Sequence, residues 1–193
     1  CSDKTGTLTK NEMTVRLIYD GEHIYDVAGS GYEPKGDILH DKMSVNTEER
    51  KRHLRVLRIG LLCNESNMYE EDGQYKVDGD PTEGALIVSA MKAGLMPEDE
   101  KKHYPQIAII PFESERGYMA TLHKHGGKKF IFVKGAPERV LDMCAGADAG
   151  DGSQKKEILH VAHNFAKEGM RVLAFACKEV SHEGEELTHQ NIE

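Results

Sequence analysis

The chain has 193 residues, with 25 Lys and Arg against 33 Asp and Glu, and a formal net charge of −8. This length suits one domain or slightly more, and the acidic balance argues against nucleic acid as the main partner. The longest apolar runs, 107–110 and 130–133, are far too short to span a bilayer, and no signal peptide is visible.

The first third of the chain predicts a hairpin, a loop and a helix. Alternating apolar residues over 14–19 and 23–27 predict two strands joined at an Asp-Gly turn. Residues 29–41 are rich in Gly, Pro and charge, which is typical of an exposed loop. A capping residue and two glutamates then predict a helix over 47–62.

From residue 67 onward, hairpins alternate with helices. Hairpins are expected over 67–77, around an Asp-Gly pair, and over 118–134, around a Gly-Gly pair. The other expected elements are helices over 81–93, 136–143 and 153–168, a buried strand over 106–111 and a strand over 171–177. Because the strands come in hairpins rather than βαβ units, the predicted fold class is α+β, a twisted antiparallel β-sheet flanked by helices.

The short run Asp3-Lys4-Thr5-Gly6-Thr7 combines a carboxylate, a cation and two hydroxyl groups. An ionised Asp3 can attack a phosphoryl group as a nucleophile. Lys4 can offset phosphate charge, and Thr5 and Thr7 can supply donors. Gly6 lets the backbone approach closely. The alternative is an ordinary polar turn.

Later segments contain groups with both structural and ligand-binding uses. Asp80 and Glu83 have the spacing of a capping box at a helix start. Lys134 and Gly135 end a predicted strand. Lys134 can present a cation there and Gly135 permits a close approach of the backbone to a ligand. The alternative is an ordinary strand-to-helix turn. Phe112 alone would be a core residue at a strand end. No Gly-x-x-x-x-Gly-Lys-Ser/Thr loop occurs in the sequence.

The run from Asp3 resembles, letter for letter, the phosphorylation motif of P-type ion-transporting ATPases. The segments 79–86, 111–116, 134–138 and 169–174 resemble motifs of the nucleotide-binding domain of that family, in the family's order. The resemblance extends from residue 1 to about 178. The Lys-Gly-Ala-Pro-Glu motif and the size of the insert resemble the type II, calcium-pump-like group.

The resemblance implies a role for each motif. Asp3 would take the γ-phosphate of ATP beside Lys4 and Thr5, and Asp3 and Thr5 would contact Mg²⁺. Glu83 would accept a hydrogen bond from adenine, and Phe112 would stack on the base. The remaining implied nucleotide-binding residues are Arg116, Lys134, Gly135, Arg171 and Leu173. Of these, Lys134 would lie in the ATP pocket, Arg171 would meet the phosphates or ribose, and Leu173 would contact the base.

Two departures from the family pattern concern affinity and turnover. Gly117 stands where many calcium pumps have a pocket lysine, which leaves affinity more dependent on Lys134. The Thr-Gly-Asp and Gly-Asp-Gly-x-Asn-Asp segments that hold Mg²⁺ and phosphate in the family do not occur in this sequence. We therefore expect the chain to bind ATP without hydrolysing it.

The sequence begins at Cys1 without an initiator Met and is expected to be an excised fragment. Residues 1–12 are interpreted as the edge of a phosphorylation domain with a hinge, 13–180 as the nucleotide-binding domain, and 181–193 as a second hinge or frayed tail. The implied partners are ATP and the phosphorylation, actuator and transmembrane domains of the same polypeptide. The expected setting is a monomeric cytoplasmic domain of an integral membrane protein, without membrane contact of its own.

Two other classes remain open from the sequence. A soluble phosphatase of the haloacid dehalogenase superfamily also uses an aspartyl nucleophile. Such enzymes typically have a second Asp two residues later, where this chain has Thr5. A non-catalytic nucleotide-sensing module is the other alternative. Release of phosphate from an acyl phosphate would favour the phosphatase, whereas ATP binding without turnover fits a pump domain or a sensor.

Overall fold

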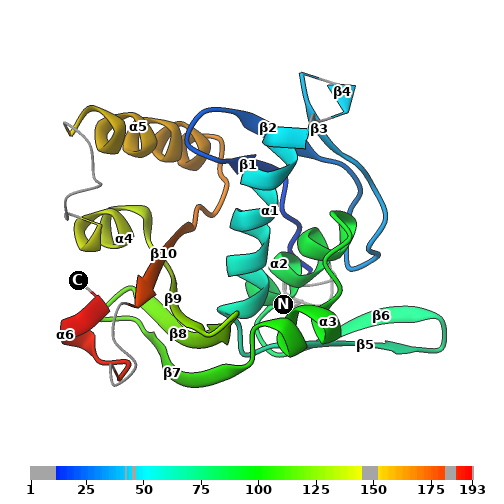
Figure 1. Ribbon diagram of the computed structural model, residues 1–193. Coiled ribbons are helices and arrows are strands. Elements are labelled where there is room, and N and C mark those ends of the chain that lie inside the picture. Colours follow the sequence, from blue (N-terminus) through cyan, green and yellow to red (C-terminus); the bar gives the residue numbers. More distant parts are fainter. Residues whose placement is uncertain (1–11, 42, 45–46, 145–151, 181–185, 193) are drawn as a thin grey trace, which may run out of the picture. The chain divides into compact units, whose positions relative to one another are not determined.

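The computed structural model describes residues 12–41, 43–44, 47–144, 152–180 and 186–192. By its internal contacts the chain divides into two compact parts, Cys1–Asp99 (unit 1) and Glu100–Glu193 (unit 2). Figure 1 shows their helices and strands. The run that begins at Asp3 lies outside the described residues.

Unit 1 contains a four-stranded antiparallel sheet in the order β1-β2-β3-β4. Its strands are β1 (Leu17–Tyr19), β2 (Ile24–Val27), β3 (Ile38–His40) and β4 (Met43–Ser44). The predicted first hairpin is confirmed. The predicted loop over 29–41 is wrong at its end, where β3 pairs with β2. The side chain of Ile38 is 9% exposed, so this short strand contributes an apolar residue to the core.

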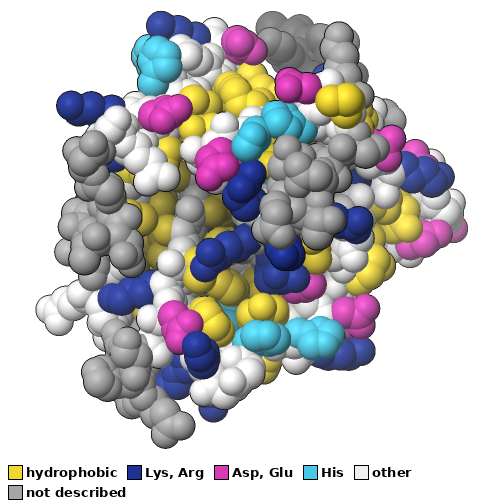
Figure 2. Space-filling model, turned by 45° about the horizontal axis from the view of Figure 1, so that its top comes forward, with side chains coloured by type: hydrophobic (Ala, Val, Ile, Leu, Met, Phe, Trp, Pro, Cys, Tyr) yellow, Lys and Arg dark blue, Asp and Glu magenta, His cyan; other side chains and the backbone are white. Residues whose placement is uncertain are grey.

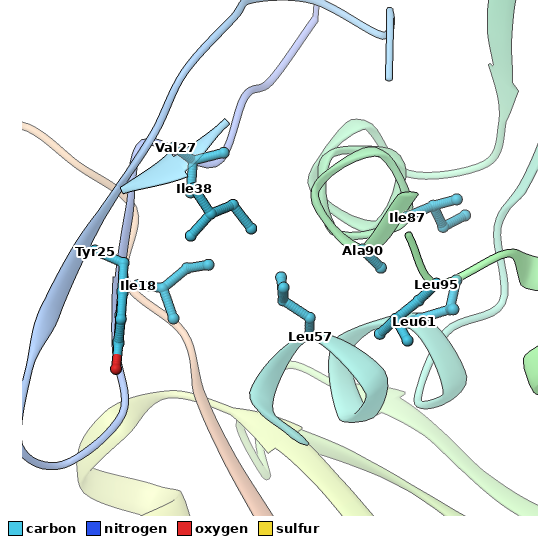
Figure 3. Packing of buried hydrophobic residues seen from close by; sticks show 9 residues of the cluster. All are labelled: Ile18, Tyr25, Val27, Ile38, Leu57, Leu61, Ile87, Ala90 and Leu95. Carbon is cyan, nitrogen blue, oxygen red and sulfur yellow. The ribbon is translucent and has the colours of Figure 1, made fainter. Parts of the chain in front are cut away.

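Two predicted helices, α1 (Thr47–Leu62) and α2 (Pro81–Lys92), are confirmed. Apolar side chains of both helices belong to one cluster of buried residues with those of the sheet (Figure 3). The core residues drawn there are Ile18, Tyr25, Val27, Ile38, Leu57, Leu61, Ile87, Ala90 and Leu95. Removal of this apolar surface from water is the main term that holds unit 1 together.

Asp20 fastens the turn between β1 and β2 to helix α1. Its carboxylate accepts hydrogen bonds from the backbone N–H groups of Glu22 and His23, from the Tyr25 hydroxyl at 2.6 Å and from Arg52 Nε at 3.0 Å. Burial alone would raise the pKa of Asp20. The hydrogen bonds outweigh burial and lower this pKa to about 2.

Unit 1 also contains the predicted hairpin of β5 (Asn67–Glu71) and β6 (Gln74–Asp78). Asp72 and Gly73 form its turn with φ values of 53° and 72°, as a two-residue hairpin turn requires. A short helix that the sequence analysis did not predict, α3 (Pro97–His103), follows α2.

Unit 2 is built on a second antiparallel sheet in the order β10-β9-β8-β7. Its strands are β7 (Gln106–Glu113), β8 (Tyr118–His125), β9 (Lys128–Gly135) and β10 (Ala174–Val180). The hairpin predicted over 118–134 is confirmed. The strand predicted over 106–111 exists, but its predicted burial is wrong, because β7 is the edge strand and most of its side chains are exposed.

The helices of unit 2 are α4 (Pro137–Met143), α5 (Ser153–Lys167) and α6 (His189–Ile192). Ile192 is 5% exposed and belongs to the same apolar cluster as Tyr118 and Val140. The predicted fold class is confirmed, with antiparallel sheets flanked by helices. Within the described residues, the helices are all too short or too polar to cross a bilayer.

Candidate functional site

Six of the predicted nucleotide-binding residues belong to unit 2 and lie at or beside one end of its sheet. They are Phe112, Arg116, Lys134, Gly135, Arg171 and Leu173. At this end Glu113 of β7 pairs with Tyr118 of β8. Gly135 of β9 lies between Tyr118 and Ala174 of β10 and pairs with both. Because β7 and β9 end where β8 and β10 begin, segments far apart in the sequence meet here.

Phe112 is 53% exposed, which places it among the exposed large apolar residues of the described chain. Strand β7 has one residue more than β8 between Ile110 and Glu113, so Pro111 and Phe112 together lie opposite Met119. Proline cannot donate to a ladder, and an edge strand at a bulge tolerates it. The structural alternative of a core Phe is therefore wrong, and the bulge presents the ring to solvent.

Lys134 lies on the other side of Met119 in the same ladder. Two strand spacings, about 10 Å, therefore separate its backbone from the Phe112 bulge. Phe175 of β10 pairs with Lys134, so Met119, Lys134 and Phe175 share one face of the sheet. The Lys134 side chain is 6% exposed, and lysine is rarely buried to this extent. Lys134 is thus not an ordinary surface lysine.

Gly135 permits a close backbone approach, as predicted, but the approaching group belongs to the chain itself. A Cβ atom at this position would lie 2.4 Å from the carbonyl oxygen of Gly117 and 2.8 Å from Tyr118 Cβ. The backbone N–H of Ala136 donates to the same Gly117 oxygen at 2.9 Å. Glycine is therefore required here by the junction of β9 with the turn before β8, and contact with a nucleotide stays a prediction.

Arg116 lies in the turn 113–117 between β7 and β8. The backbone N–H groups of Arg116 and Gly117 donate to the Glu113 carbonyl at 3.0 and 2.8 Å. Arg116 Nε also donates to Glu113 Oε2 at 2.6 Å, and this contact raises the pKa of the guanidinium. Gly117 has a φ of +72°, a left-handed conformation that favours glycine over lysine. The turn therefore gives a conformational reason for the departure from the calcium-pump pattern.

Arg139 of α4 holds this turn from another direction. Its Nε donates to the Arg116 carbonyl at 3.2 Å, and its guanidinium carbon lies 5.8 Å from the centre of the Tyr118 ring. The Tyr118 hydroxyl is 2.6 Å from Nδ1 of His189 in α6. The sequence analysis missed the contacts of Glu113 and Arg139. The spacing of Glu113 and Arg116, three residues apart, is the local signal that could have indicated the first.

Arg171 and Leu173 lie in the segment before β10, which begins at Ala174 rather than at the predicted residue 171. Arg171 is exposed and Leu173 is half-buried. Because Ala174 pairs with Gly135, the segment joins the sheet at the same end as the Phe112 bulge.

Glu83 belongs to unit 1, where it has a clear structural contact. Asp80 is the N-cap of α2 and accepts from the backbone of Thr82 and Glu83, as predicted. In a complete capping box, the Glu83 side chain would accept the backbone N–H of Asp80. Here that N–H donates to the Ser66 hydroxyl. Glu83 Oε2 accepts from Ser66 Oγ at 2.8 Å and from the backbone of Glu65 and Ser66. The role of Glu83 toward adenine stays a prediction.

A family model described as "P-type ATPase, cytoplasmic domain N" matches residues 53–193. The chain therefore belongs to the P-type ATPase family, in its cytoplasmic domain N. The predicted resemblance to a nucleotide-binding domain of a cation-transporting, calcium-pump-like ATPase is confirmed.

Named relatives agree with this assignment. The chain is 40% identical, over its whole length, to the cation-transporting ATPase pma1 of Synechocystis. It is 38% identical to the calcium-transporting ATPase of Bacillus subtilis, over 93% of the chain. It is 36% identical to the human calcium-transporting ATPase type 2C member 1, over 91% of the chain. These matches cover 22%, 21% and 20% of the relatives, so the chain spans about a fifth of their length.

Proposed function

We propose that the chain binds ATP as the nucleotide-binding part of a cation-transporting P-type ATPase. The observation that carries the proposal is the exposed ring of Phe112, which a bulge turns outward about two strands from the buried Lys134. A base stacked on an aromatic ring gains about 1–3 kcal/mol. Two of the named relatives are calcium-transporting ATPases, which favours Ca²⁺ as the transported ion.

The cations at the same end of the sheet suit the phosphate groups. Arg116 and Arg171 each carry a planar guanidinium that can donate two hydrogen bonds to one phosphate. Lys134 supplies a further positive charge. In this arrangement Phe112 and Leu173 hold the base, the three cations attract the phosphates, and Gly135 keeps the strand ends close together.

In the longer protein we infer that Asp3 is the phosphoryl acceptor. One oxygen of its carboxylate bonds to the γ-phosphorus while the bond to the β–γ bridging oxygen breaks and ADP leaves. Lys4 and Thr5 would orient the phosphate. Mg²⁺ held at Asp3 and Thr5 would neutralise charge on the transferring group. These three residues lie outside the described part of the chain, so their fit to Mg²⁺ rests on sequence alone.

The acyl phosphate would then drive the movement of the cation through the membrane part of the same polypeptide. The chain would act on the cytoplasmic side, together with the phosphorylation and actuator domains. The relatives' greater length is consistent with such additional domains.

An NMR titration with ATP, first without and then with Mg²⁺, tests the proposal. We expect saturable shifts of the amides around Phe112, Lys134 and Arg171. Phe112→Ala should weaken binding by roughly tenfold, since loss of one stacked base typically costs about 1–3 kcal/mol.

Ile107 provides a matched control for Phe112. It is 46% exposed at a second register shift of the same strand, between Gln106 and Ala108. Ile107→Ala should leave ATP affinity unchanged. Absence of shifts at millimolar ATP in a folded chain would overturn the proposal, and phosphate release from an acyl phosphate would favour the soluble phosphatase instead.

A further inference from the structure

Glu113 and Arg116 form an ion pair whose geometry is fixed by the turn that contains it. Arg116 Nε lies 2.6 Å from Glu113 Oε2. The Glu113 carbonyl accepts the backbone N–H groups of Arg116 and Gly117, so the backbone itself brings the two side chains together. This reduces the conformational entropy that an exposed ion pair usually loses when it forms.

The position of Arg116 is restricted from a second side. Arg139 Nε donates to the Arg116 carbonyl at 3.2 Å, and the Arg139 guanidinium lies over the ring of Tyr118, which is 2% exposed. The turn is thus held by α4 as well as by Glu113. The side chains of Glu113 and Arg116 are 54% and 43% exposed, so an anion in solution can still reach the guanidinium.

A carboxylate and a phosphate offer the same kind of acceptor to a guanidinium. Phe112 and Glu113 are the last two residues of β7, and Arg116 follows Glu113 by three residues in the adjoining turn. Under the proposed function, the phosphates of a nucleotide stacked on Phe112 would therefore meet a guanidinium that already has an anionic partner. To pair with Arg116, a phosphate must either displace Glu113 Oε2 or share the guanidinium with it and approach a like charge.

We propose that Glu113 competes with nucleotide phosphates for Arg116 and thereby lowers the affinity of the chain for polyphosphate nucleotides. This inference rests on the proposed function. The inference predicts that removing the Glu113 charge increases the affinity for ATP rather than decreasing it. The gain depends on the number of phosphates, because adenosine does not need Arg116.

The experiment compares Glu113→Gln with Glu115→Gln in the whole chain, by NMR titration or calorimetry with ATP and with adenosine. Glu115 is an exposed carboxylate in the same turn, and it makes no hydrogen bond or ion pair with any described residue. Both variants remove one negative charge at nearly the same place. Glu113→Gln should bind ATP about two- to fivefold more tightly, a range set by the usual strength of exposed ion pairs.

Glu115→Gln should change ATP affinity by clearly less, and neither variant should change the affinity for adenosine. With Arg116→Gln already present, Glu113→Gln should no longer strengthen ATP binding, which separates local competition from the general effect of net charge. Equal effects of the two glutamate variants, or weaker ATP binding by Glu113→Gln, would overturn the inference alone. Absence of ATP binding by the unsubstituted chain would overturn the proposed function, and the inference with it.

Discussion

Single carboxylates organise several turns of this chain by accepting more than one hydrogen bond. Asp20 accepts from two backbone N–H groups, a tyrosine and an arginine, and Asp80 caps α2. Glu83 accepts from both the backbone and the hydroxyl of Ser66. Each of these acceptors serves donors that would otherwise have to be satisfied by water.

Asp20 gives a prediction about acid stability. Its folded-state pKa of about 2 lies below the ordinary value of 3.8. The ionised carboxylate therefore contributes stability that is complete above about pH 4 and lost as the pH falls through about 2. Asp20→Asn should lower the free energy of unfolding at pH 7 on the order of 1 kcal/mol, a value discounted for the solvent exposure of Arg52.

Urea unfolding at several pH values measures this difference. It should shrink below pH 4, be much smaller near pH 2, where Asp20 in the folded chain is half protonated, and vanish only well below pH 2. Asp26→Asn is a suitable control, because Asp26 lies in the adjacent strand with an exposed side chain. A difference between wild type and Asp20→Asn that persisted at the lowest pH would contradict the assignment.

Elements that depend on residues close together in the sequence could be predicted from local sequence patterns. The Gly126-Gly127 turn predicted the β8–β9 hairpin, because both residues take positive φ values. Asp80 predicted the start of α2. Strand β3 was missed because its apolar signal is only a few residues long and lies beside a Gly- and Pro-rich stretch. The exposure of β7 was missed because strand order is a non-local property.

The candidate site was predictable only in part. The motif residues Phe112, Lys134 and Arg171 indicated which segments to examine, and the ladder brings those segments to one end of a sheet. The bulge that exposes Phe112 depends on the partner strand, so no pattern within 106–113 alone specifies it. Likewise, the contact between Arg139 and the Arg116 carbonyl joins residues 23 positions apart.

The contact of Glu83 with the loop before β5 predicts a structural effect at the level of elements. Glu83→Gln weakens a charged acceptor that serves three donors, so unit 1 should lose about 1–2 kcal/mol of stability in the absence of any nucleotide. Chemical denaturation measures this loss. Glu98→Gln, an exposed position in α3, should have no effect. Unchanged stability combined with weaker ATP binding would show instead that Glu83 acts mainly on the nucleotide.

At the scale of the whole molecule, the distribution of charge bears on how a polyanion such as ATP can bind. On the face shown in Figure 2, acidic, basic and hydrophobic side chains are interspersed. The formal net charge of −8 opposes the approach of a polyanion at long range. Binding of ATP would therefore depend on the local cations around the end of the second sheet rather than on the overall field of the protein.

The chain as a whole should bind ATP without turning it over. Phosphoryl transfer depends on positioning and on a metal that neutralises charge, and the sequence lacks the Thr-Gly-Asp and Gly-Asp-Gly-x-Asn-Asp segments. A phosphate-release assay with ATP and Mg²⁺ should give the rate of the buffer alone. A full-length relative in the same assay provides the positive control, and release by this chain that Asp3→Asn abolished would contradict the expectation.

The bulge in β7 makes the end of the unit 2 sheet that carries Phe112 sensitive to residue number as well as residue type. Two residues of β7 lie opposite Met119 at the bulge, so shortening the stretch between Ile110 and Glu113 by one residue would leave a single residue there and abolish the bulge that exposes Phe112. Replacing Pro111 by another residue keeps the spacing, whereas deleting it does not. Under the proposed function, a one-residue deletion in this segment of a homologue therefore predicts altered nucleotide binding more strongly than a substitution at the same place does.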